Sequence, residues 1–190
     1  MNDTFPSWLG ILTELRVLIL RSNGIYGALG SPNSSFDFSN IHIMDLSHNN
    51  ITGELPSQYF PNWKSMRRVE VNGAMYMHSN FSSTYIYSMT LVNKGTKIVY
   101  ERILVFFMAI DLSSNKFEGE IPEVVGHLKG LKLLNLSNNF LTGPIPSCLG
   151  NLTKLESLDL SQNKLDGVIP LQLTQLTFLE SFNVSHNLLT

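Results

Sequence analysis

Residues 131–170 read LKLLNLSNNFLTGPIPSCLGNLTKLESLDLSQNKLDGVIP, and this stretch decides the fold. It contains the phrase L-x-x-L-x-L-x-x-N-x-L-x-G-x-I-P twice, with the two copies 24 residues apart and starting at Leu131 and Leu155. Eight positions repeat in both identity and register. A fixed period of roughly 20–29 residues with this leucine spacing indicates an array of stacked repeats.

Each position of the repeated phrase has a physical explanation. The last two leucines of L-x-x-L-x-L alternate with polar residues, which is the period of a strand with one buried face. Stacked repeats place such strands in a parallel sheet about 4.8 Å apart, and their leucines fill a core that one repeat cannot bury alone. We therefore predict a leucine-rich repeat solenoid, a right-handed superhelix of the α/β type. Its parallel sheet lies on the concave face, and 3-10 turns and loops lie on the convex face.

A turn asparagine follows each predicted strand. Its side chain both donates and accepts hydrogen bonds, so it can satisfy backbone groups that the turn would leave unpaired. The predicted turn asparagines are Asn23, Asn49, Asn115, Asn139, Asn163 and Asn187. Successive gaps between them are 26, 66, 24, 24 and 24 residues. The gap of 66 exceeds one period by 42 residues, which is not a multiple of 24, so we predict a non-repeat insertion there.

The chain divides into three predicted parts. Repeats occupy residues 1–71, an insertion that we call the island occupies residues 72–103, and repeats resume over residues 104–190. Both ends fall inside a repeat and lack the polar caps that terminal repeats need. From this we expect the chain to be a fragment of a longer protein.

Two details of register follow from the same alignment of repeats. A strand is predicted to begin at Met66, Val69 and Val71, just before the island. After the island, Phe107 takes the place of the first leucine of the phrase, and Ile110 takes the place of the second. Phe107 is therefore expected in the leucine core.

The island differs from the repeats in composition. Residues 57–103 hold six Lys and Arg and two Glu, a net charge of +4, and five of the six tyrosines. Residues 88–92 and 96–100 read as strands around Asn93-Lys94-Gly95, which predicts a β-hairpin with a three-residue loop. Long insertions in solenoids lie on one face and often bind ligands, and aromatic and basic side chains are typical of recognition patches. The candidate ligand-binding residues are Tyr85, Tyr87, Lys94, Gly95, Lys97 and Tyr100. Packing against the solenoid, or the hairpin turn in the case of the glycine, explains the same residues without a ligand.

The sequence predicts a binding protein and not an enzyme. Its five histidines are scattered, and no His, Cys, Asp or Glu cluster has the spacing of metal ligands. No glycine-rich phosphate loop is present, and no cofactor is expected. The single cysteine, Cys148, allows no disulfide within the chain. The net charge of −2 gives no basic patch typical of nucleic-acid binding.

Two further sets of residues are candidates for function. On the predicted concave sheet, side chains that point away from the core form a candidate partner-binding surface; they are Asp111, Asn135, Asp159 and Asn183. A solvated sheet face explains most of them without a partner. Asparagines in the pattern N-x-[ST] are candidate glycosylation sites; they are Asn2, Asn33, Asn50, Asn80, Asn135, Asn151 and Asn183. The repeat phrase itself contains N-L-S and N-L-T, so sequons within it are expected without glycosylation. Asn33 and Asn80 lie outside the phrase and are the stronger evidence for glycosylation.

The L-x-G-x-I-P repeat resembles the plant-specific leucine-rich repeat. An island with the phrase Tyr85-x8-Lys94-Gly95, followed by a short run of repeats, resembles the C-terminal ectodomain of plant leucine-rich-repeat receptor-like proteins, the Cf-type resistance proteins and their relatives. The resemblance implies a cell-surface receptor without a kinase domain, acting in defence or development. It also implies a protein or peptide ligand at the island and concave surface, and co-receptor and adaptor receptor kinases as partners. The chain would lie on the extracellular side of the cell membrane, anchored by a single-pass segment that is not in this sequence.

Two alternatives stay open at the level of sequence. One is a secreted inhibitor of a cell-wall-degrading enzyme, similar to the polygalacturonase-inhibiting proteins, although these are plain solenoids without an island. The other is a truncated fragment without function, because repeats without caps leave apolar core in water.

Overall fold

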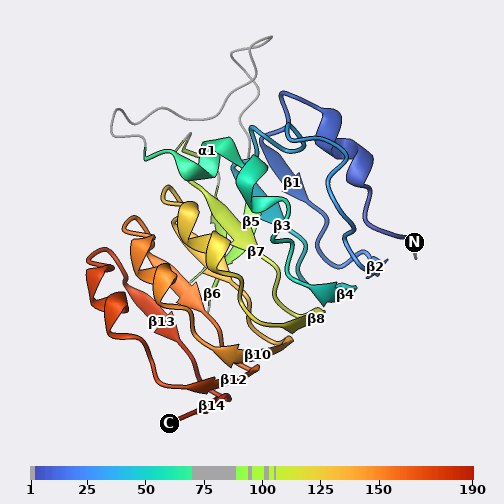
Figure 1. The fold of residues 1–190 in the computed structure, drawn as a ribbon. Helices are drawn as coiled ribbons and strands as arrows, with labels where there is room; N and C mark the ends of the chain where they lie inside the picture. Colours follow the sequence, from blue (N-terminus) through green and yellow to red (C-terminus); the bar gives the residue numbers. More distant parts are fainter. Residues whose placement is uncertain (1–2, 70–88, 94–95, 101–102, 105) are drawn as a thin grey trace.

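The computed structural model describes residues 3–69, 89–93, 96–100, 103–104 and 106–190 of the chain. Within these residues, short parallel strands and 3-10 turns stack in chain order to form a solenoid, with the two ends of the chain at opposite ends of the stack (Figure 1). The structure confirms the predicted leucine-rich repeat architecture.

The first sheet is the predicted parallel sheet of the repeats. Its strands pair in the order β1-β3-β7-β9-β11-β13, and equivalent leucines such as Leu134 and Leu158 lie opposite each other. In every strand of this sheet except β13, the middle residue is apolar and enters the core, as the alternation predicts. The strands are β1 (Val17–Ile19), β3 (Ile43–Asp45), β7 (Ala109–Asp111), β9 (Leu133–Asn135), β11 (Ser157–Asp159) and β13 (Ser181–Asn183).

A second parallel sheet, which the sequence analysis did not predict, runs along the side of the solenoid. Its order is β14-β12-β10-β8-β4-β2. The glycine of L-x-G-x-I-P lies in these strands with a positive φ, +79° at Gly119 and +73° at Gly143, which explains why this position is glycine. The strands are β2 (Tyr26–Gly27), β4 (Asn50–Glu54), β8 (Lys116–Gly119), β10 (Phe140–Pro144), β12 (Lys164–Gly167) and β14 (Leu188–Leu189).

The convex side is built from short helical turns, as predicted. Proline lies directly before η3, η4 and η5, where its fixed φ and missing N–H cost nothing. These turns stack very closely: a Cβ on Gly150 would lie 2.4 Å from the carbonyl oxygen of Gln172 in the next repeat. The turns are η1 (Ser7–Ile11), η2 (Phe60–Asn62), α1 (Lys64–Arg67), η3 (Glu123–His127), η4 (Ser147–Asn151) and η5 (Leu171–Gln175).

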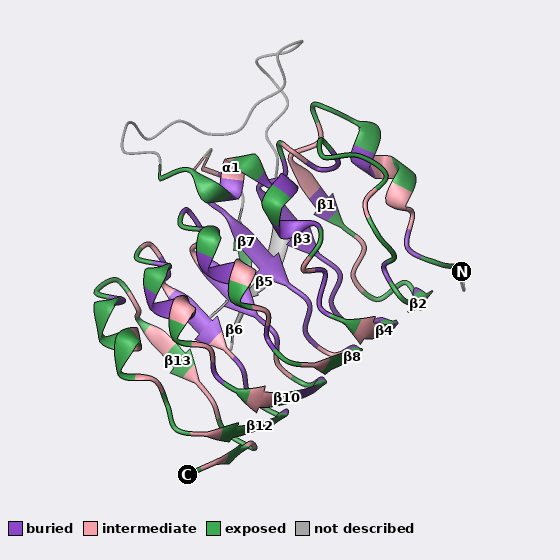
Figure 2. Cartoon of the chain, viewed as in Figure 1, coloured by how far each residue is buried: buried purple, intermediate pink, exposed green. Residues whose placement is uncertain are grey.

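The core runs continuously between the first sheet and the convex turns (Figure 2). In the C-terminal repeats it is leucine throughout, with Leu134, Leu158 and Leu160 at 0–1% exposure. Toward the N-terminal end, larger aromatic side chains such as Tyr59 and Trp63 fill the same space. Because each repeat shares its core with the next, burial in one repeat depends on its neighbours.

A ladder of buried asparagine side chains joins the repeats. Asn139 accepts the backbone N–H of Phe117 at 3.0 Å and donates to the carbonyl oxygens of Leu112 and Leu136, both at 3.1 Å. One side chain thus hydrogen-bonds two successive repeats. The same pattern occurs at Asn49, Asn115, Asn163 and Asn187. Asn23, at the start of the stack, donates only to the carbonyl oxygen of Arg21. Five of the six turn asparagines therefore bridge neighbouring repeats through their side chains.

The strand expected at residues 66–71 is wrong where the structure describes it. Met66 lies in α1, and β3 pairs directly with β7. The N–H of Gly130, which follows η3, donates to the carbonyl oxygen of Met66 at 2.8 Å. The repeats on either side of the island therefore stack on each other directly, and the residues between β4 and β7 add no strand to the first sheet.

The expected core position of Phe107 is also wrong. Met108 points into the leucine core, whereas Phe107 packs on the opposite, concave side with Ile103 and Ile43. Because the chain enters β7 from the concave side here, it reaches the strand in a different orientation from that of the later repeats.

The asparagine ladder makes a testable contribution to stability. In an Asn139→Ala variant the buried N–H of Phe117 loses its acceptor, while the carbonyl oxygens of Leu112 and Leu136 keep the amides of Asn115 and Asn163. An unsatisfied buried group costs about 1–3 kcal/mol, so we expect a loss of about 2 kcal/mol in the free energy of unfolding. Urea denaturation measures it. Asn23→Ala is the matched control, because Asn23 is exposed and makes one local bond; equal losses in the two variants would contradict the ladder's role.

Candidate functional site

The structure describes a β-hairpin in the island. Strands β5 (Met89–Asn93) and β6 (Thr96–Tyr100) pair antiparallel, and Asn93 lies opposite Thr96. The hairpin is therefore confirmed, but two residues separate the strands where three were expected. Lys97 and Tyr100 lie on β6; Tyr85, Tyr87, Lys94 and Gly95 lie outside the described residues. Their predicted ligand-binding role stays a prediction.

The end of the island packs against the concave face of the solenoid. Ile103 (1% exposed) and Phe107 form a second hydrophobic cluster with Ile43, Ala109 and Leu133, which are the outward-pointing apolar residues of β3, β7 and β9. This cluster lies on the side of the first sheet opposite to the leucine core. Residues 103, 104, 106 and 107, which we call the return segment, thus connect the end of the island to the concave face.

The concave polar residues do not all form the exposed surface that the sequence suggests. Asp111 is 1% exposed and Asn135 is 6% exposed, so in this structure a partner cannot reach their side chains. Burial, followed by the nearby charge of Asp45, raises the pKa of Asp111 to about 6. A solvated sheet face therefore does not describe Asp111 and Asn135.

The accessible part of the concave face lies further along the chain. Asp159 on β11 and Asn183 on β13 are half-buried, and the Nδ2 of Asn183 lies 3.3 Å from Oδ2 of Asp159. Each also accepts the hydroxyl of the serine two residues later, Ser161 or Ser185. These two side chains form a preformed polar patch beyond the region that the return segment covers.

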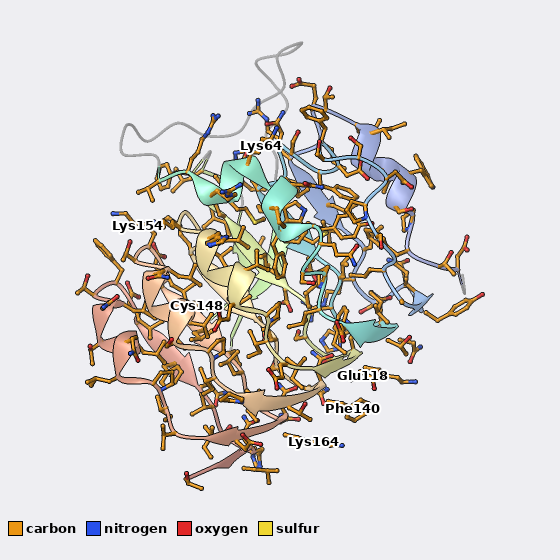
Figure 3. All side chains as sticks on the ribbon, viewed as in Figure 1. Lys64, Glu118, Phe140, Cys148, Lys154 and Lys164 are labelled. Atoms are coloured by element: carbon orange, nitrogen blue, oxygen red, sulfur yellow. The ribbon has the colours of Figure 1, made fainter. Side chains whose placement is uncertain are left out.

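A groove on the second sheet is a feature that the sequence analysis missed. Figure 3 shows Glu118, Phe140 and Lys164, which lie on the neighbouring strands β8, β10 and β12 and line the groove. The groove has a volume of about 590 Å³ and is also lined by Glu54 and Thr142. Phe140 is 48% exposed, and the Lys164 ammonium lies 5.4 Å from its ring centroid. The register of the second sheet brings these residues together, and without that sheet no sequence signal places them side by side.

The described residues form neither a metal site nor an activated thiol. They contain no group of three or more His, Cys, Asp or Glu side chains that could hold a metal ion. Cys148 lies half-buried on the convex turn η4 (Figure 3), and burial raises the pKa of its thiol. Within the part of the chain that the structure describes, no helix has the length and apolar character needed to cross a membrane.

The sequons fall into accessible and inaccessible groups. Asn33, Asn50 and Asn151 are exposed, whereas Asn135 is buried and its Oδ1 accepts both the N–H and the hydroxyl of Ser137. Asn183 is half-buried with the same serine contact. Asn2 and Asn80 lie outside the described residues. A glycan at Asn135 is incompatible with this fold.

Comparison with known proteins agrees with the repeat motifs. The family described as Leucine rich repeat matches residues 108–165, and a second match to a leucine-rich repeat family covers residues 40–61. The chain is similar to Receptor-like protein 19 of Arabidopsis thaliana, with 49% identity over 138 residues, which are 69% of this chain and 14% of that protein. It is also similar to Receptor-like protein 36 of the same plant, with 48% identity over 137 residues, which are 70% of this chain and 19% of that protein.

Solved structures of plant receptors share the fold. The crystal structure of PEPR1-AtPEP1 superposes with a TM-score of 0.71 at 25% identity, over 100% of this chain and 20% of that one. The ectodomain of GASSHO1/SCHENGEN3 from Arabidopsis thaliana, in complex with CASPARIAN STRIP INTEGRITY FACTOR 2, gives 0.71 at 28% identity over 99% of this chain and 17% of that one. A chain of the BIR3 - SERK2 complex gives 0.59 at 27% identity, over 91% of this chain and 68% of that one.

The matches define the class of the molecule first: it is a leucine-rich repeat protein, a class that binds other molecules and is not enzymatic, as the sequence predicts. The chain belongs to the leucine-rich-repeat receptor-like proteins of plants. It spans only 14% to 19% of the length of the two relatives named above.

The burial of the sequons predicts which of them carry glycans. In folded protein secreted from plant cells, we expect glycans on Asn33 and Asn151, which are exposed, and none on Asn135, which is buried and hydrogen-bonded. Mass spectrometry of glycopeptides measures the occupancy of each site. Asn33→Gln should increase electrophoretic mobility, and Asn135→Gln should not; a glycan found on Asn135 in folded protein would contradict this structure.

Proposed function

We propose that the chain is the ligand-recognition and co-receptor-docking part of a plant cell-surface receptor-like protein that lacks a kinase domain and signals in defence or development. The similarity to receptor-like proteins supports this assignment. The main structural support is the contact of the return segment with the concave face, which Ile103 and Phe107 make at the end of the island. An island that is attached to the binding face of the solenoid is placed to take part in recognition.

The proposed ligand is a protein or peptide. The PEPR1-AtPEP1 and GASSHO1/SCHENGEN3 structures are described as complexes of receptors of this fold, and the second contains CASPARIAN STRIP INTEGRITY FACTOR 2. Among the described residues, the second cluster covers Ile43, Ala109 and Leu133, whereas the polar patch on β11 and β13 is half-buried and accessible. We assign ligand contacts to the island and co-receptor contacts to the patch.

The proposed partners in the membrane are a co-receptor kinase of the somatic-embryogenesis type and an adaptor receptor kinase. The BIR3 - SERK2 structure, described as a complex, supports pairing between leucine-rich repeat chains of this kind. The full-length parent would place this chain on the extracellular side of the cell membrane, anchored by a single-pass segment. Because the parent lacks a kinase in this proposal, signalling depends on these partners.

The island assignment predicts a loss of ligand response. Tyr85→Ala and Lys94→Ala, made in the full-length receptor, remove an aromatic and a basic side chain of the kind that dominates interfaces. Such a truncation costs about 2 kcal/mol, or roughly a thirtyfold higher ligand concentration for half-maximal response. Signalling in leaf cells measures the response, and labelling of surface receptor confirms equal expression.

The chain supplies matched controls for both substitutions. Tyr26→Ala removes an exposed tyrosine from β2, and Lys129→Ala removes an exposed lysine from the convex side. Both should leave the dose response unchanged. If Tyr85→Ala and Lys94→Ala also leave it unchanged, these residues do not bind the ligand. Deleting residues 72–103 is a poorer test, because it removes Ile103 and uncovers Ile43 and Ala109.

The co-receptor assignment makes a separate prediction. The double substitution Asp159→Ala and Asn183→Ala removes the polar patch of β11 and β13. At about 1 kcal/mol for each interface side chain, the affinity for a somatic-embryogenesis-type kinase ectodomain should fall roughly thirtyfold. Binding of the purified ectodomains measures it, with Asp166→Ala on the second sheet as the control. Unchanged affinity would place the docking surface elsewhere on the chain.

A further inference from the structure

Two aspartates lie side by side under the covered part of the concave face. Asp45 on β3 and Asp111 on β7 are opposite each other in the parallel register, and neighbouring strands are about 4.8 Å apart. Their exposures are 0% and 1%. In each, Oδ1 accepts a serine hydroxyl at 2.6 Å and a backbone N–H at 3.0 Å. In each, Oδ2 is buried and has no hydrogen-bond donor.

The same Asp-x-Ser motif two repeats further along, at Asp159, has all its carboxylate contacts, and the comparison shows what is unusual at Asp45 and Asp111. Asp159 makes the same two contacts, with Ser161, at 2.6 Å and 3.0 Å. However, Asp159 is only half-buried, and its Oδ2 lies 3.3 Å from the donor Nδ2 of Asn183. Asp45 and Asp111 lack both the solvent and the lateral donor. A buried carboxylate oxygen without a donor carries a free-energy penalty. This penalty favours binding of a proton by the pair.

The charges around the pair do not cancel. Arg21, which follows β1, lowers the pKa of Asp111, but one of its guanidinium nitrogens is itself buried without an acceptor. Among the described residues, two carboxylates and one guanidinium leave a net charge of −1, and both carboxylates are buried. Two like charges at this separation oppose each other's ionisation. A proton on one carboxyl group removes the repulsion and gives the pair a donor.

The return segment packs directly beside this pair. Ile103 and Phe107 cover Ile43 and Ala109, which precede Asp45 and Asp111 by two positions and so lie on the same face of β3 and β7. Residues 103, 104, 106 and 107 carry no titratable side chain. The charged groups beside them are Lys132, whose ammonium lies 5.3 Å from the Phe106 ring centroid, and its ion-pair partner Glu156. On β9, the neighbour of Asp111 is the uncharged Asn135.

We propose that the Asp45–Asp111 pair is a proton-binding site that strengthens the docking of the return segment on the concave face in acid. In the docked state both carboxylates are buried, and a bound proton lowers the free-energy cost of that burial. Acid therefore closes the concave face between β3 and β9, and higher pH favours its opening. This regulation follows from the geometry of the concave face and holds whether or not the island binds a ligand.

The direction of the pH dependence follows from the pKa of Asp111. It is about 6 in the docked state, above the ordinary value of 3.8 that an exposed aspartate has. The docked state therefore binds more protons between these two values. Docking is strongest below about pH 4, weakens as the pH rises toward 6, and is constant above that. A difference of about two pH units limits the total change to roughly a hundredfold.

Hydrogen exchange of the intact 190-residue chain tests the proposal. The probe is the amide of Phe107, which donates to the carbonyl oxygen of Leu104 within the return segment. Its protection factor, corrected for the intrinsic pH dependence of exchange, should fall by roughly ten- to a hundredfold between pH 4 and pH 7. The amide of Leu160, which donates to Asn183 in the C-terminal repeats, is the internal reference and should change less than about twofold, since no such pair lies beside it. A flat profile at Phe107, or an equal fall at Leu160, would overturn the proposal.

Two matched variants assign the effect to the pair. Asp111→Asn imitates the protonated carboxyl group in shape and donor capacity, so Phe107 should keep its acid-level protection at pH 7. Asp159→Asn changes the same motif where it is already satisfied, and it should retain the wild-type profile. If Asp111→Asn shows the wild-type fall in protection, the pair is not the proton-binding site. These measurements use no ligand, so their failure is distinct from a failure of the receptor assignment.

Discussion

The buried asparagine side chain is the interaction on which the solenoid depends. A turn that brings the chain from the first sheet to the second exposes backbone N–H and carbonyl groups inside the core, where water cannot satisfy them. The side chain of Asn139 bonds the N–H of Phe117 in the preceding repeat and a carbonyl oxygen in each of the two repeats. No other side chain of this size offers two donors and an acceptor in one plane. The repeat period, the parallel register and the two sheets all follow from keeping this bond.

The return segment adds a second constraint, on the opposite side of the same sheet. Between β3 and β9 the strands are covered on both faces, by the leucine core and by the cluster of Ile103 and Phe107. At β11 and β13 the concave face carries the polar pair Asp159 and Asn183 and is accessible. The concave side is thus divided into a covered half and an accessible half, although the repeat phrase is nearly the same in both.

The repeats are predictable from sequence because each position has a local cause. Asn139 and Gly143 are required by a hydrogen bond and a positive φ, so their spacing alone reveals the fold. The errors lie where a long-range contact overrides the local pattern. Met66 follows the strand pattern but lies in α1, because β3 pairs directly with β7. Phe107 and Asp111 follow the repeat phrase, but the cluster formed by the return segment changes the environment of this part of the sheet. No periodicity encodes that contact.

The direct pairing of β3 with β7 allows the length of the island to change without a change in the stacking of the repeats. Because β3 pairs directly with β7, no strand lies between them in the first sheet. The free-energy cost of closing such a loop rises only with the logarithm of its length, by about 0.6 kcal/mol for each doubling. A lineage of receptors can therefore lengthen, shorten or replace this one segment at little thermodynamic cost.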